Sequence, residues 1–410
     1  MLLFKIVLLI AFTVWIVAMI PAYQYGNIGR RLLQRDKTVA AVNAELPPLS
    51  VIIAAHNQAP ALRRHLPAIL NQEYARFEVV VIDMDSKDET KDVLERFESQ
   101  YANLHHTYTP ASARDISIER LALTLGFRAA STDWVVITHP DCEPLSSQWL
   151  TRIGETIVHP CQGLQNPHVK TPDIVIGTAR YHEQRSTWFD YQIGFYRLWN
   201  ALARYHHVLG GHAAVGADGC NLAIRKSYFM ECGGFSTGQD LKAGAEELLV
   251  NHLSKASNTA LQLAPSAMVI QDRIGSRRLW KQERVFYAET RRHQHHAAFY
   301  RFTQAFKLFM PWFVILCLLF PLIGSIAFCL QNPEAETVFL YYLLAAILGL
   351  LLLSYIVTKI VCLYKTTRAW GCRSYYLSFL LFELYIPFWH LSARLARRFS
   401  ARNEFRKKFV

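Results

Sequence analysis

Three short groups of polar residues follow apolar runs in the first 144 residues of the chain, at 54–57, 83–90 and 139–144. Asp83 closes the second run, where a carboxylate can accept hydrogen bonds from a bound base or sugar. Asp141 is a hard oxygen donor, suited to Mg²⁺ or Mn²⁺ when substrate phosphates supply further ligands. The alternatives are a solvated loop acid at Asp141 and a helix capped at Ser86 or Asp88.

A sheet whose strands alternate with amphipathic helices would position these groups. Strand-helix repeats of this spacing predict an α/β domain with a mostly parallel sheet and helices on both faces. Ligands of such sheets bind outside the carboxyl ends of the strands, so the three groups are candidates for a binding site. We expect strands at 50–56, 78–83, 103–108 and 134–138, and helices at 60–72, 88–99 and 118–130.

Four segments in a fixed order resemble the nucleotide-binding half of glycosyltransferase family 2, whose members are inverting transferases with the Rossmann-like GT-A fold. Each segment alone is a weak signal, whereas the ordered set at strand ends is hard to produce by chance. The resemblance continues through 216–235, 244–253 and 289–293 and covers most of residues 49–293. The four segments read SVIIAAHN, VVVIDMDSKDET, ALTLGFRAAST and ITHPDCEPLSSQW.

The resemblance implies a site for a nucleotide-sugar donor, which we expect to be UDP-linked. Asp83 matches the acid that contacts the nucleotide, and Ala54 and Asn57 match residues that form the base pocket. Arg120 matches a basic position that reaches the phosphates. We add Asp85, from the same turn as Asp83, to the donor-binding candidates.

Metal binding is implied in an altered form. Asp141 matches the second acid of the family's D-x-D motif, and His139 replaces the first acid. Imidazole ligates Mn²⁺ but suits Mg²⁺ poorly, so we expect a divalent metal, Mn²⁺ or Mg²⁺, with a shift toward a softer ion.

The catalytic base is implied at the segment Gly244-Ala245-Glu246-Glu247-Leu248, where the family has Gly-Glu-Asp. Alignment on Gly244 places Glu246 at the base position, with Glu247 as the fallback. A carboxylate there would remove the proton of an acceptor hydroxyl as its oxygen attacks the anomeric carbon. The alternative is a helix that begins with two acids, which favour the helix dipole.

The Q-x-x-R-W pattern of processive polysaccharide synthases is reduced here to 289–293, which reads ETRRH. Arg292 keeps the arginine, and with Arg291 it forms a basic pair that can hold a leaving diphosphate by charge-assisted bonds. Loss of the Gln and Trp argues against extrusion of a long polymer. We expect one sugar added per encounter, to a lipid-linked or membrane-proximal glycan acceptor, in polysaccharide biosynthesis of the cell envelope.

Membrane segments flank this body. The 410 residues are 52% hydrophobic and 19% charged, with a mean hydropathy of +0.11, which is too apolar for disorder and too charged for membrane spans alone. The run 6–20 predicts an uncleaved anchor, and 308–330 and 338–362 predict a hairpin. Basic residues after the anchor and after the hairpin place the body in the cytoplasm, and the family implies a bacterial inner membrane.

A shorter stretch, 375–391, contains Glu383 and Pro387 and leads into a basic tail. We read it as an interfacial or re-entrant helix, and a fourth span stays possible. The expected domains are an anchor at 1–25, a glycosyltransferase domain at 38–300, the hairpin at 308–362, and the interfacial helix with its tail at 375–410.

The net charge of +12 lies mostly beside the membrane segments, so anionic lipid explains it better than nucleic acid does, and we expect no nucleic-acid partner. The eight cysteines lack framework spacing and are expected to be free thiols; no histidine spacing indicates zinc. The leading hypothesis is a glycosyltransferase of the hexosyltransferase type. The alternative is a catalytically impaired protein of the same fold that serves as a nucleotide-sugar-binding or scaffold component.

Overall fold

The computed structural model of the chain has two compact units. It describes residues 2–38, 45–110, 117–160, 169–182, 187–235, 241, 243–272, 274–295, 297–334, 336–372, 375 and 378–400. One unit comprises Met1–Leu32 and Ala298–Trp389, and the other comprises Leu33–Ala297 and His390–Val410. The basic tail beyond residue 400 lies outside the described residues, as do Cys161 and His296.

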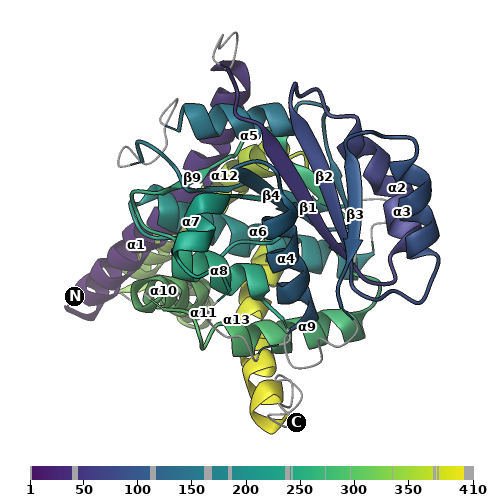
Figure 1. The fold of residues 1–410 in the computed structure, drawn as a ribbon. Helices are drawn as coiled ribbons and strands as arrows, with labels where there is room; N and C mark the ends of the chain where they lie inside the picture. Colours follow the sequence, from purple (N-terminus) through teal and green to yellow (C-terminus); the bar gives the residue numbers. More distant parts are fainter. Residues whose placement is uncertain are drawn as a thin grey trace. The chain divides into compact units, whose positions relative to one another are not determined.

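Seven strands form the main sheet of the second unit, in the order β3-β2-β1-β4-β8-β6-β9 (Figure 1). The first four strands in this order are mutually parallel, and β8 is antiparallel to both of its neighbours. β6 and β9 pair in parallel. The strands are β1 (Leu49–Ala55), β2 (Phe77–Asp83), β3 (Leu104–Tyr108), β4 (Trp134–Thr138), β6 (Ile174–Ile176), β8 (Leu222–Arg225) and β9 (Thr259–Leu261).

Helices cover both faces of this sheet because successive side chains of a strand point to opposite faces. Val51 and Ile53 belong to a buried cluster that includes side chains of α2 (Ala59–Leu70), α3 (Thr90–Glu98) and α5 (Trp149–Val158). Ile52 and Ile82 lie instead against Gly126 of α4 (Ile118–Ala129), which packs on β1 and β2 (Figure 1). The predicted α/β class, with a mostly parallel sheet between helices, is confirmed.

A small second sheet, ordered β5-β10-β7, stands beside the carboxyl end of β4. It consists of β5 (Cys142–Pro144), β10 (Val269–Gln271) and β7 (Ala179–Tyr181). Its register places Gln271 opposite Cys142 on one side and Tyr181 on the other. The remaining elements of this unit are α6 (Trp188–Leu209), α7 (Lys226–Glu231), α8 (Ala245–Leu253), the 3-10 helix η1 (Pro265–Ala267) and α9 (Arg277–Thr290).

The expected elements of the first half lie within two residues of the observed ones, and 134–138 coincides with β4. The expected cap of α3 was wrong: the N-cap residue is Glu89. Asp88 nevertheless supports the helix start, since its Oδ1 accepts the Thr90 amide at 3.1 Å. Its Oδ2 accepts the amide of Ala59, so the carboxylate is shared by the starts of α3 and α2.

The other unit is formed by long apolar helices. Three segments are long and apolar enough to cross a membrane: Phe4–Gly29, Ala298–Gln331 and Val338–Ala369. The helices are α1 (Leu2–Thr38), α10 (Ala298–Val314), the π-helix η2 (Ile315–Leu319), α11 (Phe320–Gln331), α12 (Val338–Ala369) and α13 (Ser378–Phe399), of which α1 and α13 continue into the other unit.

The three apolar segments pack on one another, since Ala11 and Ala18 share a buried cluster with Val314 and Leu348. The segments match the expected anchor and hairpin but extend beyond them, to residue 29 in α1 and over 298–307 and 363–369 in the hairpin helices. In the described residues, α13 is not among the candidate spans, and it runs on to Phe399, beyond the expected stretch. The orientation of the unit in a membrane stays a prediction.

Candidate functional site

The register of the sheet brings three strand ends to one edge. Ala55 of β1 pairs with Asp83, the last residue of β2, and Ile53 pairs with Thr138, the last residue of β4. β2 lies on one side of β1 and β4 on the other, so this edge is the point where the strand order reverses. Open α/β sheets bind their ligands at such a point, outside the carboxyl ends of the strands.

The loops after β1 and β2 are tied together by hydrogen bonds and form what we call the donor turn, residues 54–57 and 83–87. Asn57 donates its amide to Ser86 Oγ at 2.8 Å, and its side-chain Oδ1 accepts the Lys87 amide at 2.7 Å. Asp83 is 8% exposed, and its Oδ1 accepts the Ser86 amide at 3.1 Å. Four predicted donor residues, Ala54, Asn57, Asp83 and Asp85, thus lie in one connected structure.

Two residues of the donor turn have left-handed backbones. Asn57 has φ of 53° and Asp85 has φ of 57°, a region that Asn and Asp tolerate better than most residues. Asp85 binds the Lys87 ammonium at 2.7 Å, and its side chain is about half exposed. Such backbones persist only where their surroundings hold them, and they cluster at binding sites.

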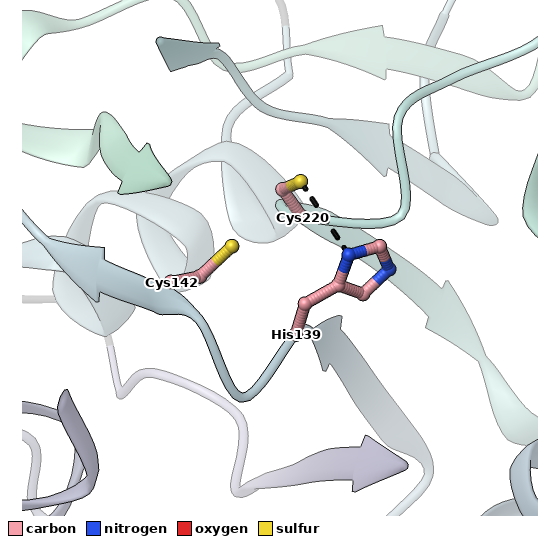
Figure 2. A group of neighbouring side chains, drawn as sticks. All are labelled: His139, Cys142 and Cys220. Carbon is pink, nitrogen blue, oxygen red and sulfur yellow. Dashed lines mark hydrogen bonds between the residues drawn. The ribbon is translucent and has the colours of Figure 1, made fainter. Parts of the chain in front are cut away.

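A polar cluster, named the buried cluster below, lies at the end of β4. It consists of Glu246, Cys142 and Cys220, which are buried, and His139, whose side chain is 32% exposed. His139 Nε2 is 3.4 Å from Glu246 Oε1, and Nδ1 is 3.8 Å from Cys220 Sγ. Figure 2 shows the sulfur of Cys220 facing the imidazole, with the sulfur of Cys142 directed into the same space. Because both ring nitrogens of His139 face these groups, the structure does not pair His139 with Asp141.

Glu246 and Glu247 occupy the first turn of α8 and are both buried. Two glycines of the loop before β8 allow this burial by close approach. A Cβ at Gly219 would come within 2.7 Å of Glu246 Oε1 and His139 Nε2, and a Cβ at Gly216 within 2.5 Å of Glu247 Cγ. The two acids therefore start a helix, as the alternative reading held, and also contact other segments of the domain.

The two glutamates differ in electrostatics. Burial raises the pKa of a carboxyl group, yet the hydrogen bond with His139 and the charge of His139 bring the pKa of Glu246 below its usual value. Burial also opposes charging of His139, but Cys220 and Glu246 raise its pKa well above the usual value. In Glu247 burial dominates and raises the pKa, although Oε1 accepts a hydrogen bond from Gln294 at 2.9 Å. Glu246 is therefore the better ionised of the two acids.

Asp141 lies next to this cluster with its own partner. Gln271 Nε2 donates to Asp141 Oδ2 at 3.1 Å, and Cys142 Sγ lies 3.7 Å from Oδ1. A carboxylate oxygen that accepts one hydrogen bond keeps another lone pair, so Asp141 has the chemistry of a protein ligand for an ion bound mainly to phosphates. His139, predicted as the second ligand of that ion, contacts Glu246 and Cys220.

Arg120 and Arg291 act electrostatically on the two glutamates of α8. Arg120 is 2% exposed, and its charge lowers the pKa of Glu246. Arg291 lowers the pKa of Glu247. Arg292 is 62% exposed and lies 3.6 Å from Glu289 Oε2, which also accepts from Arg397 Nη1 at 3.0 Å.

An arginine pair beside the cluster was missed in the sequence. Arg197 and Arg204 both bind Asp218, and Arg197 also donates to Gln271 Oε1 at 2.6 Å and lies 3.5 Å from Cys220 Sγ. Burial raises the pKa of Glu283, on α9, to about 7 despite the charge of Arg197. The two arginines of α6 were not singled out from the sequence. They are seven positions apart and therefore lie on one face of the helix.

Asn221, which follows Cys220, is buried and has a role in the core of the domain. Its Oδ1 accepts from Trp149 Nε1 at 3.0 Å, and its Nδ2 donates to Thr178 O and Ala267 O at 3.0 and 2.8 Å. The cysteines of the described residues are free thiols, as expected. The proximity of Cys142 and Cys220 could not be read from sequence spacing, because the fold alone brings them together.

Comparison with known proteins gives the same family that the motifs resemble. Residues 50–233 match the family model "Glycosyl transferase family 2". Glycosyltransferase AglE of Haloferax volcanii is 30% identical over 118 residues, which are 28% of this chain and 37% of that protein. Probable glycosyltransferase YdaM of Bacillus subtilis is 32% identical over 104 residues, or 24% of each. The matched segments thus span well under half of these two relatives.

Two solved structures are similar at low sequence identity. The mannosyltransferase PcManGT from Pyrobaculum calidifontis, in complex with GDP-Man and Mn²⁺, is 17% identical with a TM-score of 0.48, covering 96% of this chain and 99% of that one. TarS 1–349 of S. aureus in complex with UDP-GlcNAc is 12% identical with a TM-score of 0.41, covering 79% and 89%.

Proposed function

We propose that the chain is an inverting glycosyltransferase, since residues 50–233 match the glycosyl transferase family 2 model and contain most of a mostly parallel sheet. Its donor is a nucleotide sugar, UDP-linked as the sequence leads us to expect. Its acceptor is a lipid-linked or membrane-proximal glycan. The observation that carries the proposal is the buried, ionised Glu246 beside the sheet edge where the strand order reverses.

The donor turn binds the nucleotide in this proposal. Asp83 accepts hydrogen bonds from the base or sugar, Ala54 and Asn57 contact the base, and Asp85 lies at the exposed rim of the same turn. The hydrogen bonds that fix the turn support this role, since they hold its polar groups in place before a ligand arrives. Arg120 acts through its charge on the buried cluster.

Asp141 holds the divalent ion that accompanies the donor, with Mn²⁺ or Mg²⁺ as the candidate ions. When bound, such an ion would neutralise negative charge on the leaving nucleoside diphosphate. The carboxylate of Asp141, fixed by Gln271, supports this assignment. His139 was predicted as the other ligand of this ion. We assign it instead to the hydrogen bond with Glu246, the proposed base.

Glu246 acts as the general base. Its carboxylate takes the proton of an acceptor hydroxyl, the hydroxyl oxygen forms the new bond to the anomeric carbon, and the nucleoside diphosphate leaves from the opposite face. Attack opposite the leaving group inverts the anomeric configuration. A pKa below the usual carboxyl value keeps Glu246 ionised at neutral pH, and Glu247, with a raised pKa, is the weaker candidate.

Arg291 and Arg292 bind the departing diphosphate by charge-assisted hydrogen bonds. The exposed guanidinium of Arg292 supports this role, because a group at the surface can reach an incoming ligand. Transfer is non-processive, as the altered 289–293 segment leads us to expect. Three apolar helices support attachment to a membrane, and we propose the bacterial inner membrane with the transferase domain in the cytoplasm.

One observation favours a second candidate, a catalytically impaired protein that binds nucleotide sugars as a scaffold component. The hydrogen bond between His139 and Glu246 already engages the proposed base. If that ion pair does not open to an acceptor, donor binding would persist without transfer.

Calorimetric titration with UDP, with and without Mn²⁺, tests the donor site on the detergent-solubilised chain. We expect Mn²⁺-dependent binding that Asp141→Ala abolishes. A screen of UDP-sugars for UDP release in proteoliposomes of bacterial lipid then tests transfer. UDP binding without release under any condition would favour the scaffold candidate, and no binding of UDP would contradict the proposed donor.

A further inference from the structure

His139, Cys142 and Cys220 form a group with the composition of a zinc site. One ring nitrogen of His139 and the two sulfurs all lie within 4.8 Å of one another, and Cys142 and Cys220 are 0% and 3% exposed. Zn–S and Zn–N bonds of about 2.3 and 2.0 Å place tetrahedral ligands roughly 3.5–3.8 Å apart. The observed separation of His139 Nδ1 and Cys220 Sγ, 3.8 Å, meets this spacing (Figure 2).

From this geometry we propose that the chain binds one Zn²⁺ ion through His139 Nδ1, Cys142 Sγ and Cys220 Sγ, with water as the fourth ligand. Two thiolates and an imidazole are soft donors that select zinc over Mg²⁺ or Mn²⁺. The site is distinct in chemistry from the oxygen ligand Asp141, and it holds whether or not the chain transfers sugar.

The second nitrogen of His139 supports the proposal. A zinc-bound imidazole almost always gives its other N–H to a carboxylate or carbonyl, which fixes the ring. Glu246 Oε1 lies 3.4 Å from His139 Nε2 and supplies that acceptor. The ion would therefore orient the ring that contacts the proposed base.

The three ligands come from segments that the sheets hold in place. His139 follows the last residue of β4, and Cys142 begins β5. Cys220 precedes β8, which pairs with β4, and its carbonyl accepts a hydrogen bond from Thr138 Oγ1 at 2.9 Å. An ion here would join the start of the small sheet to the main sheet. Its three ligands are already held by the two sheets, so binding requires no rearrangement of the fold.

Charge also balances at this place. Zn²⁺ with two thiolates and a neutral imidazole has no net charge, and binding releases the thiol protons and the imidazole proton to water. The guanidinium of Arg197 lies 3.5 Å from Cys220 Sγ and favours the thiolate, while Asp218 compensates Arg197.

Metal analysis of the full chain, purified in detergent with a phosphine reductant and without a polyhistidine tag, tests the site. After incubation with Zn²⁺ and removal of free ion, we expect about one zinc per chain. Cys142→Ser/Cys220→Ser should lose at least tenfold in bound zinc. Cys232→Ser is the matched control, because Cys232 is a free thiol outside the group, and it should retain zinc.

Co²⁺ loading of the wild-type chain gives a readout that needs no variant to fold. We expect the sulfur-to-cobalt charge-transfer band and the visible bands of tetrahedral Co²⁺, displaced by Zn²⁺. Absence of these bands, zinc retained by the double variant, or isolation of a Cys142–Cys220 disulfide under reducing conditions would overturn the proposal. A chain that binds zinc but transfers no sugar would instead contradict only the proposed function.

Discussion

The donor turn and the buried cluster lie at the same edge of the sheet and are built differently. The donor turn is local: Asn57, Asp83 and Ser86 are linked by hydrogen bonds between two consecutive loops. The cluster is assembled from distant segments, since His139 and Glu246 are 107 positions apart, and it is held by burial and charge. A site of the first kind presents groups to a ligand, whereas the second kind tunes the ionisation of its own residues.

The largest expected effect is a loss of turnover when the buried cluster, rather than the donor turn, is altered. Glu246→Gln removes the proposed base while preserving the size of the side chain, so we expect turnover to fall by roughly 10²–10⁴-fold. UDP release from the best UDP-sugar in proteoliposomes measures it. Glu247→Gln is the matched control and should keep turnover within a few fold; the reverse order would move the base to Glu247.

Asp83→Ala, in the donor turn, should weaken donor binding rather than slow the chemical step. Loss of hydrogen bonds to a charged group costs about 1.5–3 kcal/mol, so the KM for the donor should rise by roughly 10- to 100-fold. The same UDP-release assay at varied donor concentration measures KM and kcat. A fall in kcat with an unchanged KM would remove Asp83 from the donor site and break the comparison.

A smaller effect is expected where the cluster is packed most closely. In Gly219→Ala the new methyl group would lie within 2.7 Å of Glu246 Oε1 and His139 Nε2, and overpacking of this kind costs about 1–3 kcal/mol. We expect a lower unfolding temperature and reduced turnover. Gly275→Ala, at a position with nothing within 4 Å, is the matched control and should change neither. Equal behaviour of the two variants would show that the cluster tolerates displacement.

The smallest expected effect is on the pH dependence of folding stability, which should have opposite signs for two carboxyl groups. Burial raises the pKa of Glu283 to about 7 from an ordinary 4.5, so the folded chain binds this proton more tightly than the unfolded chain. The wild type should therefore lose stability relative to Glu283→Gln as the pH rises from 4.5 to 7, and the difference should stay constant above 7. Thermal unfolding of the solubilised chain across this range measures it.

Asp88, the residue that follows the donor turn, supplies the contrasting case. Burial slightly opposes the charge of Asp88, but hydrogen bonds from Thr90 and Ala59 lower its pKa below the ordinary 3.8. Its contribution to stability should be present at neutral pH and lost only as the pH falls below 3.8, so Asp88→Asn should destabilise most at neutral pH. The same direction of pH dependence for Glu283→Gln and Asp88→Asn would contradict the opposite pKa shifts of these two carboxyl groups.

The sequence predicted the donor turn better than the cluster, for physical reasons. Alternating apolar runs determine where β1, β2 and β4 end, so the position of Asp83 could be derived from periodicity, and the family match over residues 50–233 confirmed the resemblance. The cluster depends on contacts between distant segments, which periodicity does not encode. Cys220 meets His139 across 81 positions, and its part in a metal group could not be foreseen.

The altered motifs show the same limit. Substitution of His139 for an acid suggested a changed metal ligand, but the structure turns its ring to Glu246 and Cys220. The sequence could show that the residue type had changed but not which neighbour it would contact. The roles of Glu246, Asp141 and the arginine pair therefore stay proposals.

Calorimetric titration of UDP into Asp83→Ala and Glu246→Gln, beside the wild type, most directly tests whether the donor turn binds the donor and the buried cluster acts in transfer. We expect Asp83→Ala to weaken UDP binding by roughly 10- to 100-fold, and we expect Glu246→Gln to bind UDP as the wild type does and to fail only in transfer. Normal UDP binding by Asp83→Ala, or loss of UDP binding in Glu246→Gln, would contradict these expectations.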